Sequence, residues 1–207
     1  MSRTSSQALR ITAVILCGGR ASRMGGADKG LLEFAGERLA ARAARRISGQ
    51  VDSVMVSANR NLSEYAALGF PVVEDEIGGY AGPLAGVHAA MLRLGEGERA
   101  SAVLTVPCDS PFFPDGYARR MRQALEGNPG ASCAVACVGG VRQPAFALYR
   151  SELCGEIGRF LATGGRRLGE FLAGHGAVRV DFEDLSAFDN LNTPQELRKA
   201  QEIKKFP

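Results

Sequence analysis

Short apolar runs of the kind that form buried strands alternate along the first half of this chain with segments of helical periodicity. Strands are expected at Ile11–Cys17, Val51–Ser57, Pro71–Val73 and Ser101–Val106. Helices are expected around Glu37–Ile47, from Pro83 to Leu94 and from Pro114 to Glu126. A regular alternation of strands and helices is typical of a mostly parallel sheet that helices cover on both faces. We therefore predict an α/β protein with three layers.

The second half of the chain interrupts this alternation. The apolar segments Ala131–Val138 and Ala145–Tyr149 are joined by Gly139-Gly140-Val141-Arg142, which favours a hairpin or another irregular excursion over a crossover helix. The segments that follow are helices at Glu152–Ala162 and Arg166–Ala173, a strand at Ala177–Phe182, and a last helix that begins with the capping box Thr193-Pro194-Gln195-Glu196. The sheet is therefore expected to be mixed.

The length and composition are those of one globular domain. The chain has 207 residues, of which 45% are hydrophobic, enough for one full core and rather short for two. No internal repeat, low-complexity tract or linker divides it. We predict a single domain from residue 11 to residue 207, preceded by a flexible polar segment over residues 1–10.

Charge and cysteine content bear on partners and compartment. The net charge of +3 is mild, and the arginines are scattered without an aromatic-interleaved basic patch, so we expect anionic small molecules and no nucleic acid as partners. None of the five cysteines is in a C-x-x-C pair, and reduced core cysteines are typical of the cytoplasm. The longest apolar run, Ile11–Cys17, is too short for a membrane span or a secretory signal, so no membrane partner is expected.

The first predicted strand runs into a loop rich in glycine and cations. Gly18 and Gly19 leave backbone N–H groups accessible at the carboxyl end of a strand, where ligands of open α/β sheets bind. Arg20, Arg23 and Lys29 add positive charge, which favours a polyphosphate ligand. A Walker A loop is excluded because Lys29 lacks a preceding Gly and a following Ser or Thr, and Arg20 replaces the second glycine of a dinucleotide-binding fingerprint. A plain glycine turn is the structural alternative.

Lys29 stands out in the composition of the chain. Only four of the 25 basic residues are lysines, and the other three lie within the last nine residues. Because arginine suits bidentate contacts, a single lysine in the glycine loop indicates a compact ammonium that acts as a point charge on phosphate. A codon bias toward arginine is the alternative explanation.

Carboxylates follow two further predicted strands. Asp109 comes just after Pro107, which ends the ladder of its strand, so we expect Asp109 at the carboxyl edge of the sheet beside the glycine loop. A carboxylate and a polyphosphate need a cation between them, and Mg²⁺ binds one or two carboxylates together with phosphate oxygens. Asp75 is expected at the same edge, either on base or ribose hydroxyls or as part of a loop. A turn-forming role is the alternative for Asp109.

Two more segments carry candidate ligand groups. Gly82 and Pro83 lead into a helix whose N-terminus suits an anion, although Pro83 is equally typical of an ordinary first helical turn. Asn190 and Asn192 point the same way in extended chain, which suits either a ligand or Asx turns before the last helix. The two histidines are isolated in the sequence and are expected to be structural.

Together these segments resemble the molybdenum cofactor guanylyltransferase family, within the wider group of pyrophosphorylase-like nucleotidyltransferases. The matching motifs occur in order along nearly the whole chain. They are LCGGRASRMGGADKGLLE (16–33), VSANRN (56–61), VVED (72–75), GPLAG (82–86), PCDSP (107–111) and FDNLNTPQEL (188–197). The resemblance implies a three-layer, Rossmann-like nucleotidyltransferase fold with a mostly parallel, mixed sheet.

The resemblance also implies transfer of GMP from GTP to molybdopterin, with or without molybdenum, in a Mg²⁺-dependent reaction that forms molybdopterin guanine dinucleotide and pyrophosphate. The residues it places on the nucleotide and its metal are Leu16, Cys17, Gly18, Gly19, Lys29, Ser57, Asp75 and Asp109. Relatives often carry Asn in place of Ser57 and Ala in place of Cys17. Gly82, Asn190 and Asn192 would bind the pterin. Proteins that mature molybdoenzymes are implied as further partners.

The residues are consistent with this chemistry. A phosphate monoester with a second pKa of about 6 is already ionised near neutral pH, so the reaction needs no protein base. Catalysis then consists of alignment and charge neutralisation, tasks for Lys29, Arg23, the loop amides and a metal on Asp109. Three alternatives stay open: cytidylyl transfer to the pterin, nucleotidyl transfer to a sugar 1-phosphate, and a nucleotide-binding module without turnover.

Overall fold

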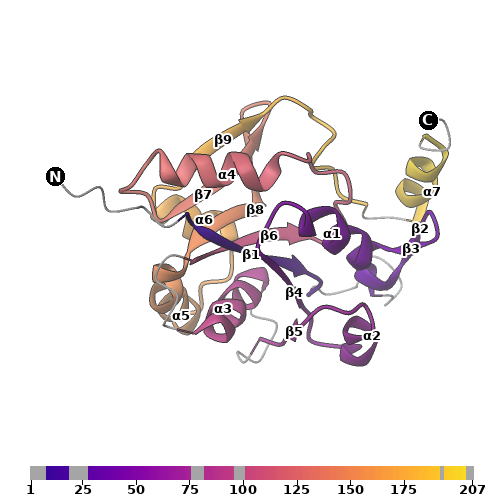
Figure 1. Cartoon of the computed structure of the whole chain (residues 1–207), viewed down its shortest axis with the longest axis horizontal. Coiled ribbons are helices and arrows are strands. Elements are labelled where there is room, and N and C mark those ends of the chain that lie inside the picture. Colours follow the sequence, from indigo (N-terminus) through magenta and orange to yellow (C-terminus); the bar gives the residue numbers. More distant parts are fainter. Residues whose placement is uncertain (1–7, 19–27, 76–81, 96–100, 192–193, 204–207) are drawn as a thin grey trace.

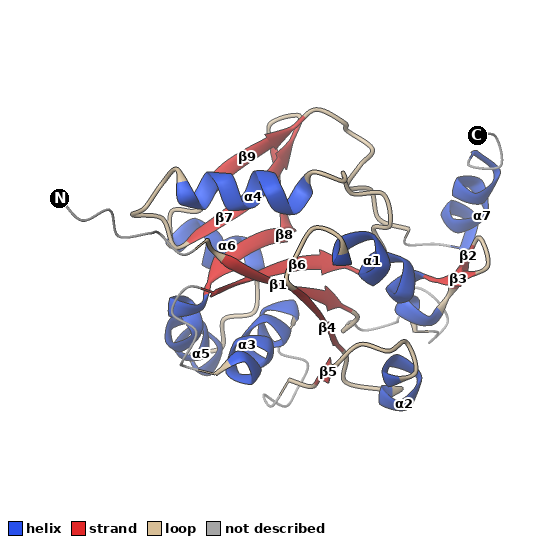
Figure 2. Ribbon diagram, in the orientation of Figure 1, coloured by secondary structure: helices blue, strands red, loops and turns tan. Residues whose placement is uncertain are grey.

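The computed structural model describes residues 8–18, 28–75, 82–95, 101–191 and 194–203 (Figures 1 and 2). Seven strands form one sheet in the order β5-β4-β1-β6-β8-β7-β9. Their bounds are β1 Arg10–Leu16, β4 Ser53–Ser57, β5 Val72–Val73, β6 Ser101–Pro107, β7 Cys133–Val138, β8 Val141–Arg150 and β9 Val178–Phe182. Only β8 runs antiparallel to its neighbours, which confirms the prediction of a mostly parallel, mixed sheet.

Helices cover both faces of the sheet, as the alternation of strands and helices predicts. One face is packed by α1 (Leu39–Ser48), α2 (Leu62–Ala66) and α4 (Tyr117–Glu126), and the other by α3 (Pro83–Leu94), α5 (Cys154–Ala162) and α6 (Leu168–Gly174). Short 3₁₀ turns lie at Lys29–Leu31 and Ser151–Leu153. No helix in these ranges has the length and apolar character needed to cross a lipid bilayer.

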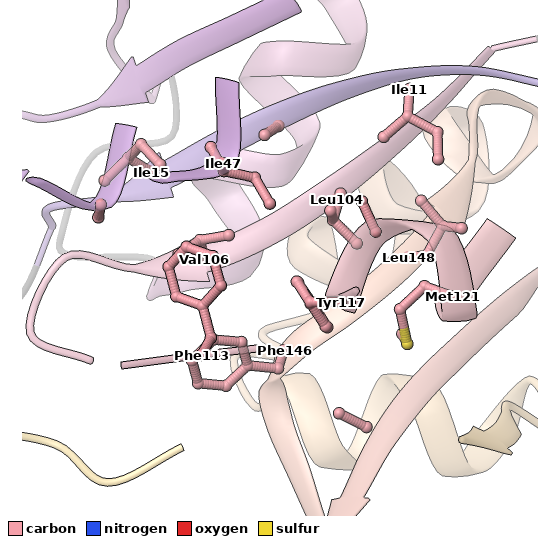
Figure 3. Close-up of a cluster of buried hydrophobic side chains, with 14 of the residues drawn as sticks. Ile11, Ile15, Ile47, Leu104, Val106, Phe113, Tyr117, Met121, Phe146 and Leu148 are labelled. Carbon is pink, nitrogen blue, oxygen red and sulfur yellow. The ribbon is translucent and has the colours of Figure 1, made fainter. Parts of the chain in front are cut away.

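Alternating side chains of the central strands supply the two layers of core. In β1, Ile11 and Ile15 pack toward α1, whereas Val14 and Leu16 pack toward α3. A strand buried on both faces must be apolar at nearly every position, and this is why β1 reads as a continuous hydrophobic run. Figure 3 shows side chains of the first of these layers. Within this layer, Tyr117 packs edge-on against the rings of Phe113, Phe146 and Phe188.

The C-terminal helix α7 (Pro194–Ile203) packs on a small hairpin formed by β2 (Glu33–Phe34) and β3 (Glu37–Arg38). The cluster that joins them contains Phe34, Leu39 and Leu191, with Leu197 and Ala200 of α7 against it. This packing brings the segment before α7 back to the edge of the sheet where β1 and β6 end.

Several element bounds differ from the sequence prediction. The helix expected from Glu37 begins at Leu39, because Glu37 and Arg38 pair with the preceding strand β2. The helix expected from Pro114 begins at Tyr117. Strand β8 already begins at Val141, so the hairpin turn shrinks to two glycines with positive φ. Helix α2 was not predicted. Near the start of the chain, Leu9 is buried and Arg10 begins β1, so these two residues belong to the fold and not to the expected flexible segment over residues 1–10.

Candidate active site

A cleft of about 190 Å³ opens at the carboxyl ends of β1 and β6. It is lined by Leu16, Cys17, Gly18, Asp28, Lys29, Arg60, Pro83, Pro107, Cys108, Asp109 and Ala145. The strands β1 and β6 are parallel neighbours in the middle of the sheet, with Leu16 opposite Pro107. Ligands of open α/β sheets bind outside the carboxyl ends of such strands, so the cleft lies where the topology predicts a ligand site.

The sheet is interrupted beside this cleft. Strands β6 and β8 pair only as far as Leu104, after which the Thr105 hydroxyl replaces the ladder by accepting from Ala147 N at 3.0 Å and donating to Ala147 O at 3.2 Å. On the other side of β8 the register shifts opposite Val135. Bulges of this kind bend a strand and occur next to active sites. Here the bent stretch contributes Ala145 to the wall of the cleft.

Lys29 and Asp109 meet across the cleft. Lys29 Nζ donates to Asp109 Oδ2 at 3.1 Å, and the side chains are 26% and 16% exposed. The backbone oxygen of Asp109 accepts from Leu191 N at 2.7 Å, which fixes the turn after β6 to the segment before α7. Lys29 and Asp109 are 80 positions apart in the sequence. The structure therefore brings together the residue predicted to bind phosphate and the residue predicted to bind the metal.

A buried carboxylate next to Lys29 was missed by the sequence prediction. The side chain of Asp28 is 4% exposed and accepts hydrogen bonds from Tyr65 OH at 2.6 Å, Asn61 Nδ2 at 3.0 Å and Arg60 Nε at 3.1 Å. Burial above all raises the pKa of Tyr65, and the neighbouring Asp28 charge adds to the rise, so the phenol keeps the proton that it donates. Gly30 makes room for this ring, because a Cβ there would lie 2.4 Å from Tyr65 OH.

Asp75 follows β5 and is held by an asparagine from the end of β4. Asn59 Nδ2 donates to Asp75 Oδ2 at 2.7 Å, and Asp75 N donates to Asn59 Oδ1 at 3.0 Å. The Asn59 amide also lies 3.9 Å from the position of a Cβ on Gly18, so this pair adjoins the rim of the cleft. Asp75 is not among the lining residues themselves, and Asn59 is a positioning contact that the sequence analysis did not single out.

The side chain of Ser57 does not line the cleft. A Cβ added to Gly86 would lie 2.2 Å from Ser57 Oγ, so the hydroxyl packs against the first turns of α3. Ser57 is buried and offers its backbone oxygen to Cys17 N at 2.9 Å, which supports the end of β1. In this structure its placement is that of a packing residue behind the cleft wall.

The segments predicted to bind a second substrate border the same edge. Gly82 has a φ of +82°, and a Cβ there would lie 3.0 Å from the backbone oxygen of Arg166, so glycine is required at the start of α3. Pro83 lines the cleft. Asn190 accepts a hydrogen bond from the fully buried Ser110 hydroxyl, which ties it to the turn that carries Asp109. Gly19, Arg20, Arg23 and Asn192 lie outside the described residues.

The two cysteines of the cleft wall are buried thiols. Cys17 and Cys108 follow β1 and β6, and both are less than a tenth exposed. A hydrogen bond with the Cys17 thiol, together with burial, raises the pKa of Cys108. Because the thiolate is the reactive form, neither geometry nor charge suits Cys108 as a nucleophile, and both residues serve as small wall residues.

The described side chains could hold a metal ion only if a phosphate ligand supplied further oxygen atoms to it. They contain no group of three or more His, Cys, Asp or Glu residues that could enclose an ion. Asp28 is satisfied by three protein donors, whereas Asp109 uses only Oδ2 on Lys29. Mg²⁺ keeps several waters and needs only one or two carboxylates when phosphate oxygens complete its shell, so Asp109 suits such an ion.

The sequence of this chain is similar to a known family of nucleotidyltransferases. The family model described as MobA-like NTP transferase domain matches residues 13–178. A molybdenum cofactor guanylyltransferase of Ralstonia nicotianae is 43% identical over 201 residues, which cover 93% of this chain and 96% of that protein. A protein of the same name from Shewanella woodyi is 42% identical over 195 residues, covering 94% of this chain and 97% of its own.

Solved structures share the fold at lower identity. Molybdopterin-guanine dinucleotide biosynthesis protein A from Archaeoglobus fulgidus superposes with a TM-score of 0.72 at 20% identity, covering 94% of this chain and 98% of that one. Rv0371c of Mycobacterium tuberculosis, in complex with manganese, gives a TM-score of 0.70 at 18% identity, with 93% and 98% of the two chains covered. The expected three-layer nucleotidyltransferase fold is thereby confirmed.

Proposed function

We propose, because this chain belongs to the MobA-like NTP transferase domain family, that it transfers GMP from GTP to molybdopterin. The products are molybdopterin guanine dinucleotide and pyrophosphate. The observation that supports the proposal most directly is the ion pair of Lys29 with Asp109 at the carboxyl edge of the sheet, in a cleft that Gly18 also lines. The relatives that are about two-fifths identical over nearly their full length bear the name of this activity.

The reaction exchanges one P–O bond for another. An oxygen of the terminal phosphate of molybdopterin attacks the α-phosphorus of GTP, the bond from that phosphorus to the bridging oxygen breaks, and pyrophosphate leaves with the bonding electrons. The nucleophile arrives ionised, so no side chain has to remove a proton. The protein must hold two anions in line and neutralise the charge that grows on the departing pyrophosphate.

Lys29 is placed to meet that charge. Lys29 lines the cleft, and Asp109 orients its Nζ. Because the side chain is already ordered, contact with phosphate oxygens costs little conformational entropy. Gly18 presents backbone at the same edge and has no side chain of its own to block the approach of a phosphate. We assign Asp75 and its partner Asn59 to the nucleoside, since they adjoin the rim beside Gly18.

Asp109 would hold the divalent cation, which we take to be Mg²⁺. When bound, Mg²⁺ supplies positive charge to the phosphates of the nucleotide. We assign to the pterin Pro83, which lines the cleft, its neighbour Gly82, and Asn190, which is tied to the turn that carries Asp109. Asn192, which lies outside the described residues, is assigned to the pterin with them. The cysteines in the structure are free thiols, in keeping with a cytoplasmic enzyme that passes its product to molybdoenzymes and their maturation proteins.

The experiment that tests the proposal measures pyrophosphate release with Mg²⁺ and each of GTP, CTP, ATP and UTP, with and without molybdenum-bound molybdopterin. Release with GTP plus the pterin is expected. Release with CTP alone would reassign the enzyme to cytidylyl transfer, and no release with any nucleotide would refute nucleotidyl transfer to this acceptor. Asp109→Asn should abolish release, while Asp115→Asn, an exposed carboxylate outside the cleft, should retain it.

A further inference from the structure

Arg60 occupies an unusual position in the cleft wall. Its Nε donates to the buried Asp28 at 3.1 Å, yet the side chain remains 41% exposed and lines the same cleft as Lys29. It lies in the motif VSANRN (56–61), but the sequence alone indicates no role for it. It belongs to the short β4–α2 connection, and so reaches the cleft from a different part of the chain than the glycine loop does.

The ion pair of Arg60 leaves most of its donors unused. A structural arginine–carboxylate pair commonly forms two parallel hydrogen bonds through the guanidinium fork. Here only Nε is engaged, and neither Nη atom has a hydrogen-bond or ion-pair partner among the described residues. Asp28 does not depend on Arg60 alone, because Tyr65 and Asn61 also donate to it. The terminal donors of Arg60 therefore remain available on the cleft side.

The charge balance of the cleft indicates that those donors can bind an anionic ligand. Among the described residues, four charged side chains line the cleft: the cations Lys29 and Arg60 and the carboxylates Asp109 and Asp28, with which they pair. The formal charges of these four groups cancel. A nucleoside triphosphate brings several negative charges into the cleft. A donor binds them with little loss of free energy only if no buried carboxylate is left unpaired when the donor turns to the ligand. Arg60 can do so, because its Nε stays on Asp28 while its Nη atoms bind.

We infer that Arg60 is a ligand of the β- and γ-phosphates of the nucleotide and that Asp28 is the residue that positions it. The inference rests on the proposed function for the identity of the nucleotide, and deepens it by adding a phosphate-binding cation from outside the glycine loop. The planar fork of arginine matches phosphate oxygens in pairs, which a lysine at the same place cannot do. Asp28 directly precedes Lys29 in the chain, so the two cations are anchored close together, Arg60 on Asp28 and Lys29 on Asp109.

The test compares GTP with GMP by titration calorimetry in the presence of Mg²⁺, using the full chain. Arg60→Ala should weaken GTP binding about tenfold to a hundredfold, the loss expected for hydrogen bonds to a charged group, and should leave GMP binding within about twofold. Arg60→Lys should keep most of the defect. Arg45→Ala, which removes an arginine paired with Glu37 on the surface, should bind both nucleotides like the wild type.

The positioning role of Asp28 has a separate readout. Removal of a negative charge beside the cleft would by itself strengthen the binding of an anion. Asp28→Asn is nevertheless expected to weaken GTP binding, because Arg60 loses the carboxylate that orients it, and to have little further effect in the Arg60→Ala background. Stronger GTP binding by Asp28→Asn would overturn the positioning role.

The outcomes separate this inference from the proposed function. Wild-type turnover with GTP, combined with unchanged GTP affinity in Arg60→Ala, would overturn the inference alone. Equal losses for GTP and GMP, or a folded Arg60→Lys variant with wild-type affinity for GTP, would show that Arg60 supports structure and does not bind the terminal phosphates. If another of the four triphosphates proves to be the substrate, the same comparison is made with that nucleotide and its monophosphate. Binding of none of them would refute both.

Discussion

Replacement of Lys29 by alanine separates charge neutralisation from folding. In the structure Lys29 Nζ lies 3.1 Å from Asp109 and inside the cleft, so the variant removes one positive charge from the place where pyrophosphate departs. Loss of one donor aimed at developing charge typically costs about 2.7–4 kcal/mol in the transition state, which corresponds to a fall in kcat of about 10²–10³-fold. The measurement is pyrophosphate release at saturating GTP, Mg²⁺ and pterin.

The same substitution should change stability little. The two partners are 26% and 16% exposed, and a partly solvated ion pair contributes about 1 kcal/mol or less. For a chain of this length, 1 kcal/mol shifts the Tm by about 2–4 °C. Lys199→Ala, which removes an exposed lysine of α7, is the matched control and should match the wild type in both measurements. A Lys29→Ala protein with kcat within about twofold of wild type would refute the role, and a Tm lowered by more than about 10 °C would show a structural one.

Three further predictions concern packing and protonation. Gly86→Ala should lower the free energy of unfolding by about 1–3 kcal/mol in chemical denaturation, because the new Cβ would lie 2.2 Å from the buried Ser57 hydroxyl. Gly174→Ala is the control: its Cβ would enter open space, so the free energy of unfolding should stay nearly unchanged. Tyr65→Phe should cost about 1–3 kcal/mol, because Asp28 Oδ1 loses the hydroxyl that donates to it at 2.6 Å. Burial raises the pKa of Cys133 from 9.0 to about 11, so the unfolded chain loses this proton first and stability falls as the pH rises from about 9 to 11. Cys133→Ala should remove about 2–3 kcal/mol of that alkaline decline, measured by denaturation at several pH values.

Each of these predictions has an outcome that contradicts it. Unchanged stability of Gly86→Ala would mean that α3 and β4 are packed less tightly than the structure shows. Unchanged stability of Tyr65→Phe would mean that Asp28 is satisfied without the phenol. An alkaline decline equally steep with and without Cys133 would assign the effect to the buried tyrosines, whose pKa values burial also raises.

The sheet and its helices could be predicted because their patterns are local. Strands β1 and β6 are buried on both faces and read as unbroken apolar runs, and the predicted α3 agrees with the structure at both ends. Helix α2 has only five residues, too few to establish a helical period. The start of β8 has no buried residue, since Val141 and Arg142 are exposed, so its pairing with β7 is visible only in the hairpin geometry.

The candidate site was predictable where a residue follows a strand and obscure where it depends on a distant partner. Lys29 and Asp109 were found because the glycine loop and the end of β6 share one edge of the sheet. Asp28 was missed although it precedes Lys29, because its burial and its three donors come from residues 32 to 37 positions later in the chain. No spacing rule indicates such a contact. To find it from the sequence, one would have had to pair Asp28 with Arg60 and Asn61, which follow the end of β4.

The placement of the histidines agrees with a reaction in which the protein supplies no base. His175 follows α6 with both ring nitrogens engaged, Nε2 at 2.7 Å from Glu156 and Nδ1 at 2.8 Å from Phe171 O. His88 lies on α3 against Gly158 of α5, on the face away from α1. Neither is among the described lining residues of the cleft. An acceptor that carries its own ionised phosphate leaves the cleft only the tasks of alignment and neutralisation, and cations already held by carboxylates perform them with little loss of side-chain freedom on binding.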